Sequence, residues 1–84
     1  MTRPSATRVY VTLKKSVFDP QGRTIHEALS GLGYQGVTDV RQGKYFELSL
    51  PELDLEEAKK AAEDIAHRVL SNPVIESYRV EVEP

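Results

Sequence analysis

The chain has 84 residues, of which 29% are charged and 39% hydrophobic, with a net charge of −2 and no cysteine. This length predicts one domain, residues 1–84, with a flexible lead-in at residues 1–7. The lack of cysteine excludes a disulfide framework and a cysteine-based metal site. The lysines and arginines are dispersed, which argues against a nucleic-acid partner, and the apolar runs are too short for a transmembrane helix or secretory signal. We therefore expect a cytoplasmic protein.

The first predicted element is a strand at residues 8–14, RVYVTLK. Val9, Val11 and Leu13 alternate with polar residues. This period of two, combined with β-branched side chains, is typical of a strand that buries one face.

A helix is predicted to follow, and the residues at its two ends fit the usual preferences. Asp19 suits the N-cap, Pro20 the first helical position, and Gly33 the residue just past the end. Gly22 weakens the first turn by roughly 0.5–1 kcal/mol relative to Ala, and local structure gives no reason for it. Residues of the apolar stripe expected to face the core are Ile25, Ala28, Leu29 and Leu32.

Residues 36–50 predict two strands around a turn near Gln42-Gly43. The first of these strands is irregular, because Val37 and Val40 break the period of two. The second strand alternates regularly, with Phe46, Leu48 and Leu50 on one face.

The second helix has the clearest pattern in the chain. Asp54 and Glu57 form a capping pair, and an apolar stripe follows as far as Leu70. Asn72-Pro73 ends this helix, and a last strand is predicted at residues 76–83.

The predicted order of elements favours an α+β fold, a ferredoxin-like βαββαβ sandwich with a four-stranded antiparallel sheet and two helices on one face. The first and third strands would be central. The opposite face of the sheet would be open, and binding is expected there. Residues expected on this open face are Tyr10, Thr12, Lys14, Tyr45, Glu47, Ser49, Arg79 and Glu81.

The sequence predicts no catalytic, cofactor-binding or metal-binding residue in this chain. His26 and His67 lie on different helices without further paired donors, so both are interpreted as surface histidines. The glycines of SGLGYQG follow a helix, whereas a phosphate-binding loop precedes one. No nucleophile and base stand at a spacing that indicates a catalytic pair.

Tyr10 and Tyr45 leave two interpretations open. RNA-recognition modules place stacking aromatic side chains on such a sheet face, and GKYFEL partly matches one of their strands. Glu47, Glu81 and the negative net charge oppose RNA binding. We expect instead that the two tyrosines contact a second copy of the chain.

The segment DVRQGKY, residues 39–45, also has two interpretations. It is either a hairpin turn with solvated Arg41 and Lys44, or a cationic rim that meets an anionic partner or a nucleotide. Two neighbouring cations repel each other unless something anionic lies between them, which would favour a partner with carboxylates.

Three segments taken together resemble the PurS family, the small subunit of phosphoribosylformylglycinamidine (FGAM) synthase. They are VTLKKSVFDPQGRTIHEAL at residues 11–29, VTDVRQGKYFEL at 37–48 and LSNPVIESYRVEV at 70–82. The resemblance covers nearly the whole chain and implies the ferredoxin-like fold. It also implies a non-catalytic subunit of an ATP- and glutamine-dependent ligase in purine biosynthesis, which converts formylglycinamide ribonucleotide to FGAM.

The resemblance further implies the partners. In the family, the small subunit forms a dimer and bridges a large synthetase subunit and a glutaminase subunit, aiding assembly and ammonia transfer; ATP and Mg²⁺ are used by the complex. A second copy, as dimer or tetramer, and these two subunits are the expected partners. Residues expected at the partner interface are Lys14, Asp19, Gly22, Arg41 and Lys44, with Gly22 allowing a partner to approach closely. An RNA-binding module and an ACT-like domain that binds a small regulatory molecule are the alternatives.

Overall fold

The structure, a computed structural model, describes residues 6–84, and the first five residues of the predicted lead-in lie outside this range. β1 begins at Ala6, so Ala6 and Thr7 belong to a strand rather than to the lead-in. The elements in chain order are β1 (Ala6–Leu13), α1 (Pro20–Gly31), β2 (Gly43–Leu48), α2 (Leu55–Ile65), the π-helical turn η1 (Ala66–Leu70) and β3 (Glu76–Glu83).

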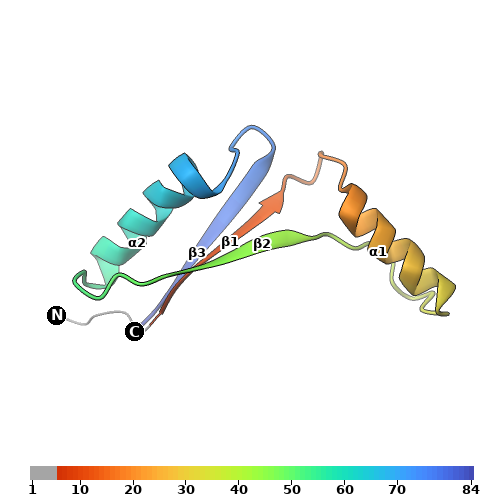
Figure 1. Cartoon of the computed structure of the whole chain (residues 1–84), viewed down its shortest axis with the longest axis horizontal. Coiled ribbons are helices and arrows are strands. Elements are labelled where there is room, and N and C mark those ends of the chain that lie inside the picture. The colour runs from red at the N-terminus through yellow and green to blue at the C-terminus, as the bar shows by residue number, and fades with distance from the viewer. Residues whose placement is uncertain (1–5) are drawn as a thin grey trace.

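The three strands form one antiparallel sheet in the order β2-β1-β3 (Figure 1). Val9 at the centre of β1 pairs with Phe46 of β2 and with Val80 of β3, so the apolar positions of all three strands share one face. The predicted alternation of faces is therefore confirmed. β1 is central, as predicted, whereas β2 lies at an edge.

Four strands were expected, and this prediction is wrong, because the sheet of residues 6–84 has three. Residues 37–42 run from α1 into β2 without a hairpin at Gln42-Gly43. Their polar groups bond to the start and middle of α1 rather than to a neighbouring strand. The Val37 carbonyl accepts from His26 Nε2 at 2.8 Å, and the Gln42 N–H donates to Asp19 Oδ2 at 2.7 Å.

α2 covers the apolar face of the sheet over β1 and β3. The predicted capping box is present: Asp54 Oδ1 accepts from the Glu57 N–H at 2.9 Å, and Glu57 Oε1 accepts from the Asp54 N–H at 3.3 Å. The core is made of small side chains, which let the helix approach the sheet closely. Its fully buried residues are Val9, Val11, Ala58, Ala62 and Ala66.

α1 forms where predicted but does not pack on the sheet. Asp19 caps it, Pro20 opens it, and Gly33 has a positive φ of 96° just past its end. The helix projects from one end of the sheet, so that the chain is an arch (Figure 1). We call its two parts the sheet limb (the three strands, α2 and η1) and the α1 limb (residues 20–40).

The dimensions of the molecule agree with this arch. Its radius of gyration is 16.2 Å and its extents are 51 × 26 × 14 Å. A compact chain of this length would have a radius of gyration of about 12 Å. The prediction that both helices cover one sheet face is therefore wrong within a single chain.

Asp54→Ala should lower the free energy of unfolding by about 1 kcal/mol, because it removes the N-cap of α2. Asp64→Ala in the same helix is the control, since Asp64 only pairs with Arg68 at 3.0 Å on the surface, and its loss should cost less than about 0.5 kcal/mol. Urea unfolding followed by circular dichroism, at one protein concentration, measures both. Equal losses would contradict the capping role.

Candidate functional site

Asp19 lies at the base of α1, where both connections to the sheet limb pass. Its carboxylate accepts two backbone N–H groups, one from Gly22 at 2.8 Å and one from Gln42 at 2.7 Å. The residue is only 5% exposed. These bonds, that of Gln42 foremost, hold the pKa of Asp19 below its ordinary value. One carboxylate thus ties the start of α1 to the start of β2.

Gly22 is buried beside Asp19 because the chain leading into β2 passes directly against it. A Cβ atom on Gly22 would lie 2.1 Å from the Val40 carbonyl oxygen and 2.9 Å from Asp19 Oδ2. Its φ is not positive, since among residues 6–84 only Gly33 has a positive φ. The chain's own backbone therefore explains this glycine, and its contact with a partner stays a prediction.

Arg41 adds a second tie between the same two connections. Its Nη2 donates to the carbonyl oxygens of Lys14 and Val17, at 2.9 Å each. The residue is not at a hairpin tip, as the sequence predicted, but beside the segment that joins β1 to α1. The guanidinium is hydrogen-bonded to these carbonyls and also interacts electrostatically with the Asp19 carboxylate, so the charge argument for a carboxylate partner no longer applies to Arg41.

Lys14 and Lys44 lie in different parts of the structure. The Lys14 backbone joins the cluster through its carbonyl, while its N–H donates to the Ile75 carbonyl at 2.8 Å and its side chain is exposed. Lys44 stands apart on the sheet, where its Nζ lies 3.4 Å from Glu76 Oε2. The structure thus brings four of the five predicted interface residues together at the base of α1 and leaves Lys44 on β2.

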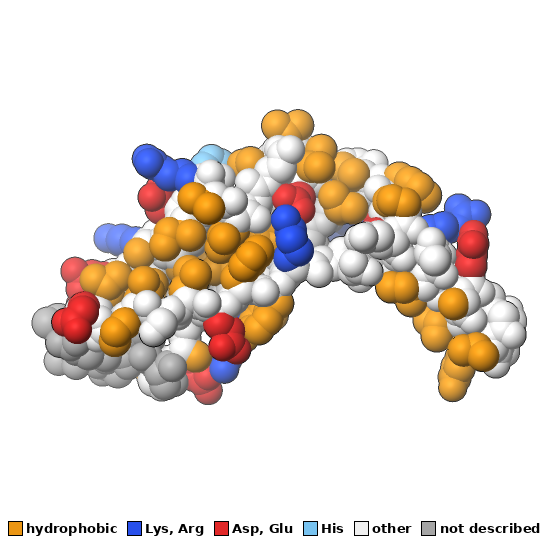
Figure 2. Space-filling model, in the orientation of Figure 1, with side chains coloured by type: hydrophobic (Ala, Val, Ile, Leu, Met, Phe, Trp, Pro, Cys, Tyr) orange, Lys and Arg blue, Asp and Glu red, His pale blue; other side chains and the backbone are white. Residues whose placement is uncertain are grey.

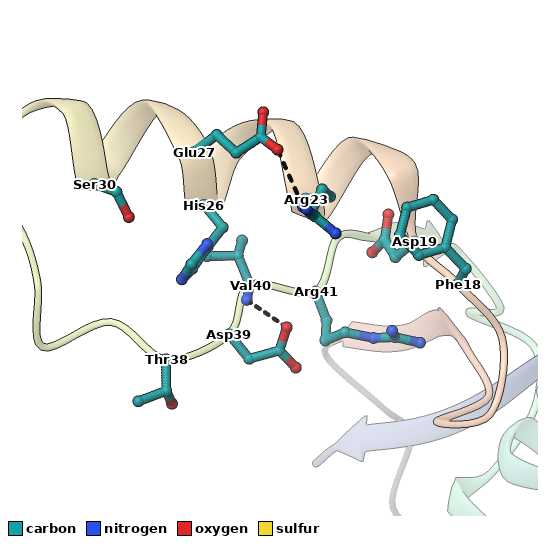
Figure 3. Close-up of a pocket in the computed structure, with 10 residues that line it drawn as sticks. All are labelled: Phe18, Asp19, Arg23, His26, Glu27, Ser30, Thr38, Asp39, Val40 and Arg41. Atoms are coloured by element: carbon teal, nitrogen blue, oxygen red, sulfur yellow. Dashed lines mark hydrogen bonds and ion pairs between the residues drawn. The ribbon is translucent and has the colours of Figure 1, made fainter.

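A pocket of about 570 Å³ lies between α1 and residues 38–41 (Figure 3). Its charged side chains are already paired: Arg23 Nε lies 3.1 Å from Glu27 Oε1, and Asp39 accepts the next backbone N–H at 2.9 Å. His26 points from α1 toward the opposite segment and bonds to a carbonyl there, so it is not the free surface histidine that was expected. This pairing leaves no convergent set of groups to hold a ligand.

Tyr10 and Tyr45 are neighbours on the open face of the sheet, as predicted. Their ring centroids are 5.2 Å apart with the planes tilted by 39°. The Arg79 guanidinium lies 4.2 Å from the centroid of the Tyr10 ring and pairs with Glu81 at 2.9 Å. The Tyr45 hydroxyl donates to Glu47 at 2.7 Å.

Carboxylates set the electrostatics of this face. A hydrogen bond to Glu81 raises the pKa of Tyr10, and one to Glu47 raises the pKa of Tyr45. In turn, hydrogen bonds from the Tyr10 hydroxyl and from Arg79 lower the pKa of the Glu81 carboxyl group. Because Arg79 covers the Tyr10 ring and each phenol is hydrogen-bonded to a carboxylate, the geometry disfavours stacking of nucleic-acid bases.

Two of the apolar surfaces left uncovered within residues 6–84 lie on α1 and on β2. One is the stripe of α1, in which Ile25 is 40% exposed and Leu32 is 74% exposed. The other is the apolar face of β2 with Phe46 and Leu48, which is only half-buried because α2 lies over β1 and β3. Figure 2 shows hydrophobic side chains between α2 and the sheet and along the lower side of the α1 limb. The sequence predicted both surfaces as core.

The described residues hold neither a metal-binding cluster nor a membrane-spanning helix. No group of three or more His, Asp or Glu side chains there lies close enough to hold a metal ion. No helix in residues 6–84 is both long and apolar enough to cross a membrane.

Comparison with known proteins gives a consistent family. Residues 6–84 match the PurS family model, described as phosphoribosylformylglycinamidine (FGAM) synthase. The chain is 45% identical over 76 residues to phosphoribosylformylglycinamidine synthase subunit PurS of Bacillus subtilis, which covers 90% of this chain and 89% of that protein. Identity to the PurS subunit of Methanocaldococcus jannaschii is 37% over 75 residues, or 89% and 90% of the two chains.

Solved structures agree with this result. The crystal structure of Methanocaldococcus jannaschii PurS, one of the subunits of formylglycinamide ribonucleotide amidotransferase, superposes with a TM-score of 0.83 over 93% of this chain and 94% of that chain. A chain in the structure of PurLQS from Thermotoga maritima is 28% identical and superposes with a TM-score of 0.82, over 92% and 94%. At these coverages the similarity includes the α1 limb.

Gly22→Ala should destabilise the fold by about 1–3 kcal/mol, because the added Cβ meets the Val40 carbonyl and the backbone must shift. Gly31→Ala, at the end of the same helix, is the matched control, since its Cβ would meet nothing within 4 Å. That change should be neutral or stabilising by up to about 1 kcal/mol. Urea unfolding compares the two, and a gain of stability in Gly22→Ala would rule out the close approach.

The contribution of Asp19 to stability should depend on pH. Its folded-state pKa is lowered below the ordinary value of 3.8. The contribution is therefore complete above the unfolded pKa and is lost as the pH falls through the folded pKa. The difference in unfolding free energy between the native chain and Asp19→Asn should be largest near neutral pH and shrink below about pH 4. A difference that stays constant from neutral to acidic pH would contradict this.

Proposed function

This chain belongs to the PurS family and is a subunit of phosphoribosylformylglycinamidine (FGAM) synthase, and we propose that its part in this ligase is assembly rather than catalysis. The observation that carries the proposal is α1, which stands off from its own sheet and leaves its apolar stripe exposed (Figures 1 and 2). A surface of this kind is a binding surface. The paired polar groups elsewhere offer no reactive site.

The first partner in this proposal is a second copy of the chain. α1 has 12 residues and is about 18 Å long, and β2 has six residues and is about 20 Å long. The exposed stripe of α1 therefore matches the length of the half-buried face of β2. If each copy lays its α1 over the β2 of the other, both apolar surfaces are covered by one symmetric exchange.

Size gives a second reason for a dimer. A chain of 84 residues buries only about 60–65% of its unfolded surface even when compact. This chain is not compact, and its fully buried core holds no side chain larger than Val. Exchange of α1 would supply the apolar burial that a single copy lacks. Tyr10 and Tyr45 lie on the opposite face and would serve pairing of two dimers into a tetramer.

The other partners are the large synthetase subunit and the glutaminase subunit. The similar chain in the PurLQS structure supports association of this kind. In this proposal the chain bridges the two subunits and aids transfer of ammonia, while ATP and Mg²⁺ bind to the complex outside this chain. The exposed side chain of Lys14, and Lys44 on β2, remain candidates for contact with carboxylates of a partner. A cytoplasmic location is part of the proposal, because the relatives are biosynthetic subunits.

Reconstitution tests the assembly function. The chain is mixed with its large subunit and glutaminase subunit, and FGAM formation is measured with either glutamine or ammonium as the nitrogen source. Omitting this chain should reduce the glutamine-dependent rate roughly tenfold or more, because ammonia is no longer delivered by proximity. The ammonium-dependent rate of the large subunit should persist. A full glutamine-dependent rate without this chain would contradict the proposal.

The exchanged dimer is tested by Ile25→Asp/Leu32→Asp. Two carboxylates on the stripe of α1 would have to be buried against β2, so this variant should sediment as a monomer where the native chain sediments as a dimer. Thr24→Asp is the matched control, because Thr24 is exposed and outside the stripe. Analytical ultracentrifugation at tens of micromolar distinguishes them, and an unchanged dimer in the double variant would place the interface elsewhere.

A further inference from the structure

The α1 limb is joined to the sheet limb by two chain segments, and both are fixed at one point. The first runs from the end of β1 to α1 through residues 14–19, and the second enters β2 through residues 41–42. The Asp19 carboxylate accepts one backbone hydrogen bond from each side of the junction, from Gly22 at 2.8 Å and from Gln42 at 2.7 Å. Arg41 reaches back from the second segment to two carbonyls of the first, at 2.9 Å each.

Contacts within the first turn of α1 complete this cluster. Gly22 lies so close to the Val40 carbonyl that no side chain fits between them. Gln42 Nε2 donates to Gln21 Oε1 at 2.9 Å. We call Asp19, Gly22, Val40, Arg41 and Gln42 the elbow. Because Asp19 and Gly22 are buried, water does not readily replace the two bonds that the Asp19 carboxylate accepts, whereas the bonds of Arg41 and of Gln42 Nε2 are exposed.

A flexible junction between the two limbs would favour a different position of α1. The stripe of α1 is apolar and has about the length of the half-buried face of β2, so with a flexible junction it would fit the β2 of its own chain as well as that of a second copy. Linked surfaces meet at an effective concentration of about millimolar when their linker is short and flexible. A second copy at micromolar concentration could not compete with that, and α1 would fold back onto its own sheet as a closed monomer.

We propose that the elbow is a conformational device that holds α1 away from its own sheet and so selects exchange between two copies over closure within one. It acts by stiffening both connections at once, which removes the intramolecular advantage of α1 for its own β2. The inference rests on the exchanged dimer proposed above. It adds that the elbow, which lies outside the apolar surfaces of α1 and β2, determines whether α1 packs on its own β2 or on that of a second copy.

Distance measurement within one chain tests the elbow. The native sequence has no cysteine, so spin labels can be placed on Gly31→Cys at the end of α1 and Glu63→Cys on α2. Both positions are exposed, and a Cβ on Gly31 meets nothing within 4 Å. Doubly labelled chain is mixed in urea with excess unlabelled chain and refolded, so that pulsed dipolar spectroscopy reports the distance within a single copy.

The labelled chain should give one narrow, long distance and sediment as a dimer. Asp19→Ala in this background should add a population at shorter distance, and the dimer dissociation constant should rise about tenfold or more, as preorganisation is lost. Arg41→Met should act in the same direction more weakly. Arg23→Met is its matched control, because Arg23 pairs only with Glu27 beside the elbow and should change neither the distance nor the dimer.

The outcomes separate the elbow from the dimer. If Asp19→Ala fails to fold by circular dichroism, Arg41→Met decides the question alone. An unchanged narrow distance and an unchanged dimer in the folded variants would overturn the elbow while leaving the dimer intact. A native chain that keeps the long distance but sediments as a monomer would overturn the exchanged dimer, and with it the selective role of the elbow.

Discussion

The carboxylate of Asp19 joins two backbone N–H groups that are far apart in sequence, those of Gly22 and Gln42, and the rest of the arch is arranged around this junction. An N-cap ordinarily satisfies one helix and nothing else. Here the second oxygen of the same side chain also fixes the chain that enters β2, so that helix start and strand start share one acceptor. The direction of α1 relative to the sheet is thereby set by hydrogen bonds between one side chain and the backbone, rather than by packing of apolar side chains.

The core of the sheet limb shows why this direction matters. Its buried residues are two valines and three alanines, together with Thr7, whose hydroxyl has no hydrogen-bond partner among residues 6–84. Small side chains bring α2 close to β1 and β3 but bury little apolar surface. Larger apolar side chains on α1 and β2, such as Ile25, Leu32 and Phe46, are left half-covered or exposed in a single copy. In the proposed dimer, stability and association would draw on the same side chains, which suits a protein whose family works within a larger enzyme.

Local signals in the sequence predicted most elements correctly, because each depends on a few neighbouring residues. The caps at Asp19 and Asp54, the turn at Gly33 and the alternating faces of β1 all belong to this kind. The position of α1 could not be predicted in the same way. A stripe of apolar residues shows that a helix is buried, but not whether the surface that buries it belongs to the same chain. The predicted fourth strand rested on Val37 and Val40 and on a turn near Gln42-Gly43. Residues 37–42 instead form hydrogen bonds to residues at the start and in the middle of α1, an arrangement that the local pattern does not encode. Gly22 was the one residue that local structure failed to explain, and it marked the junction where the arch bends.

The separation of α1 from its own sheet also has a consequence for how the protein folds. A helix of 12 residues is only marginally stable in water by itself, and here the elbow fixes only its first turn. Beyond bonds such as that of His26 to the Val37 carbonyl, the apolar stripe of the remaining turns would be covered in an exchanged dimer only by the other copy. Completion of the helix would then be a second-order event whose rate increases with protein concentration. At low concentration, newly synthesised chains would stay monomeric, with α1 incompletely ordered. In that state α1 would be accessible to proteases and to hydrogen exchange. The cell could therefore degrade subunits that have not dimerised.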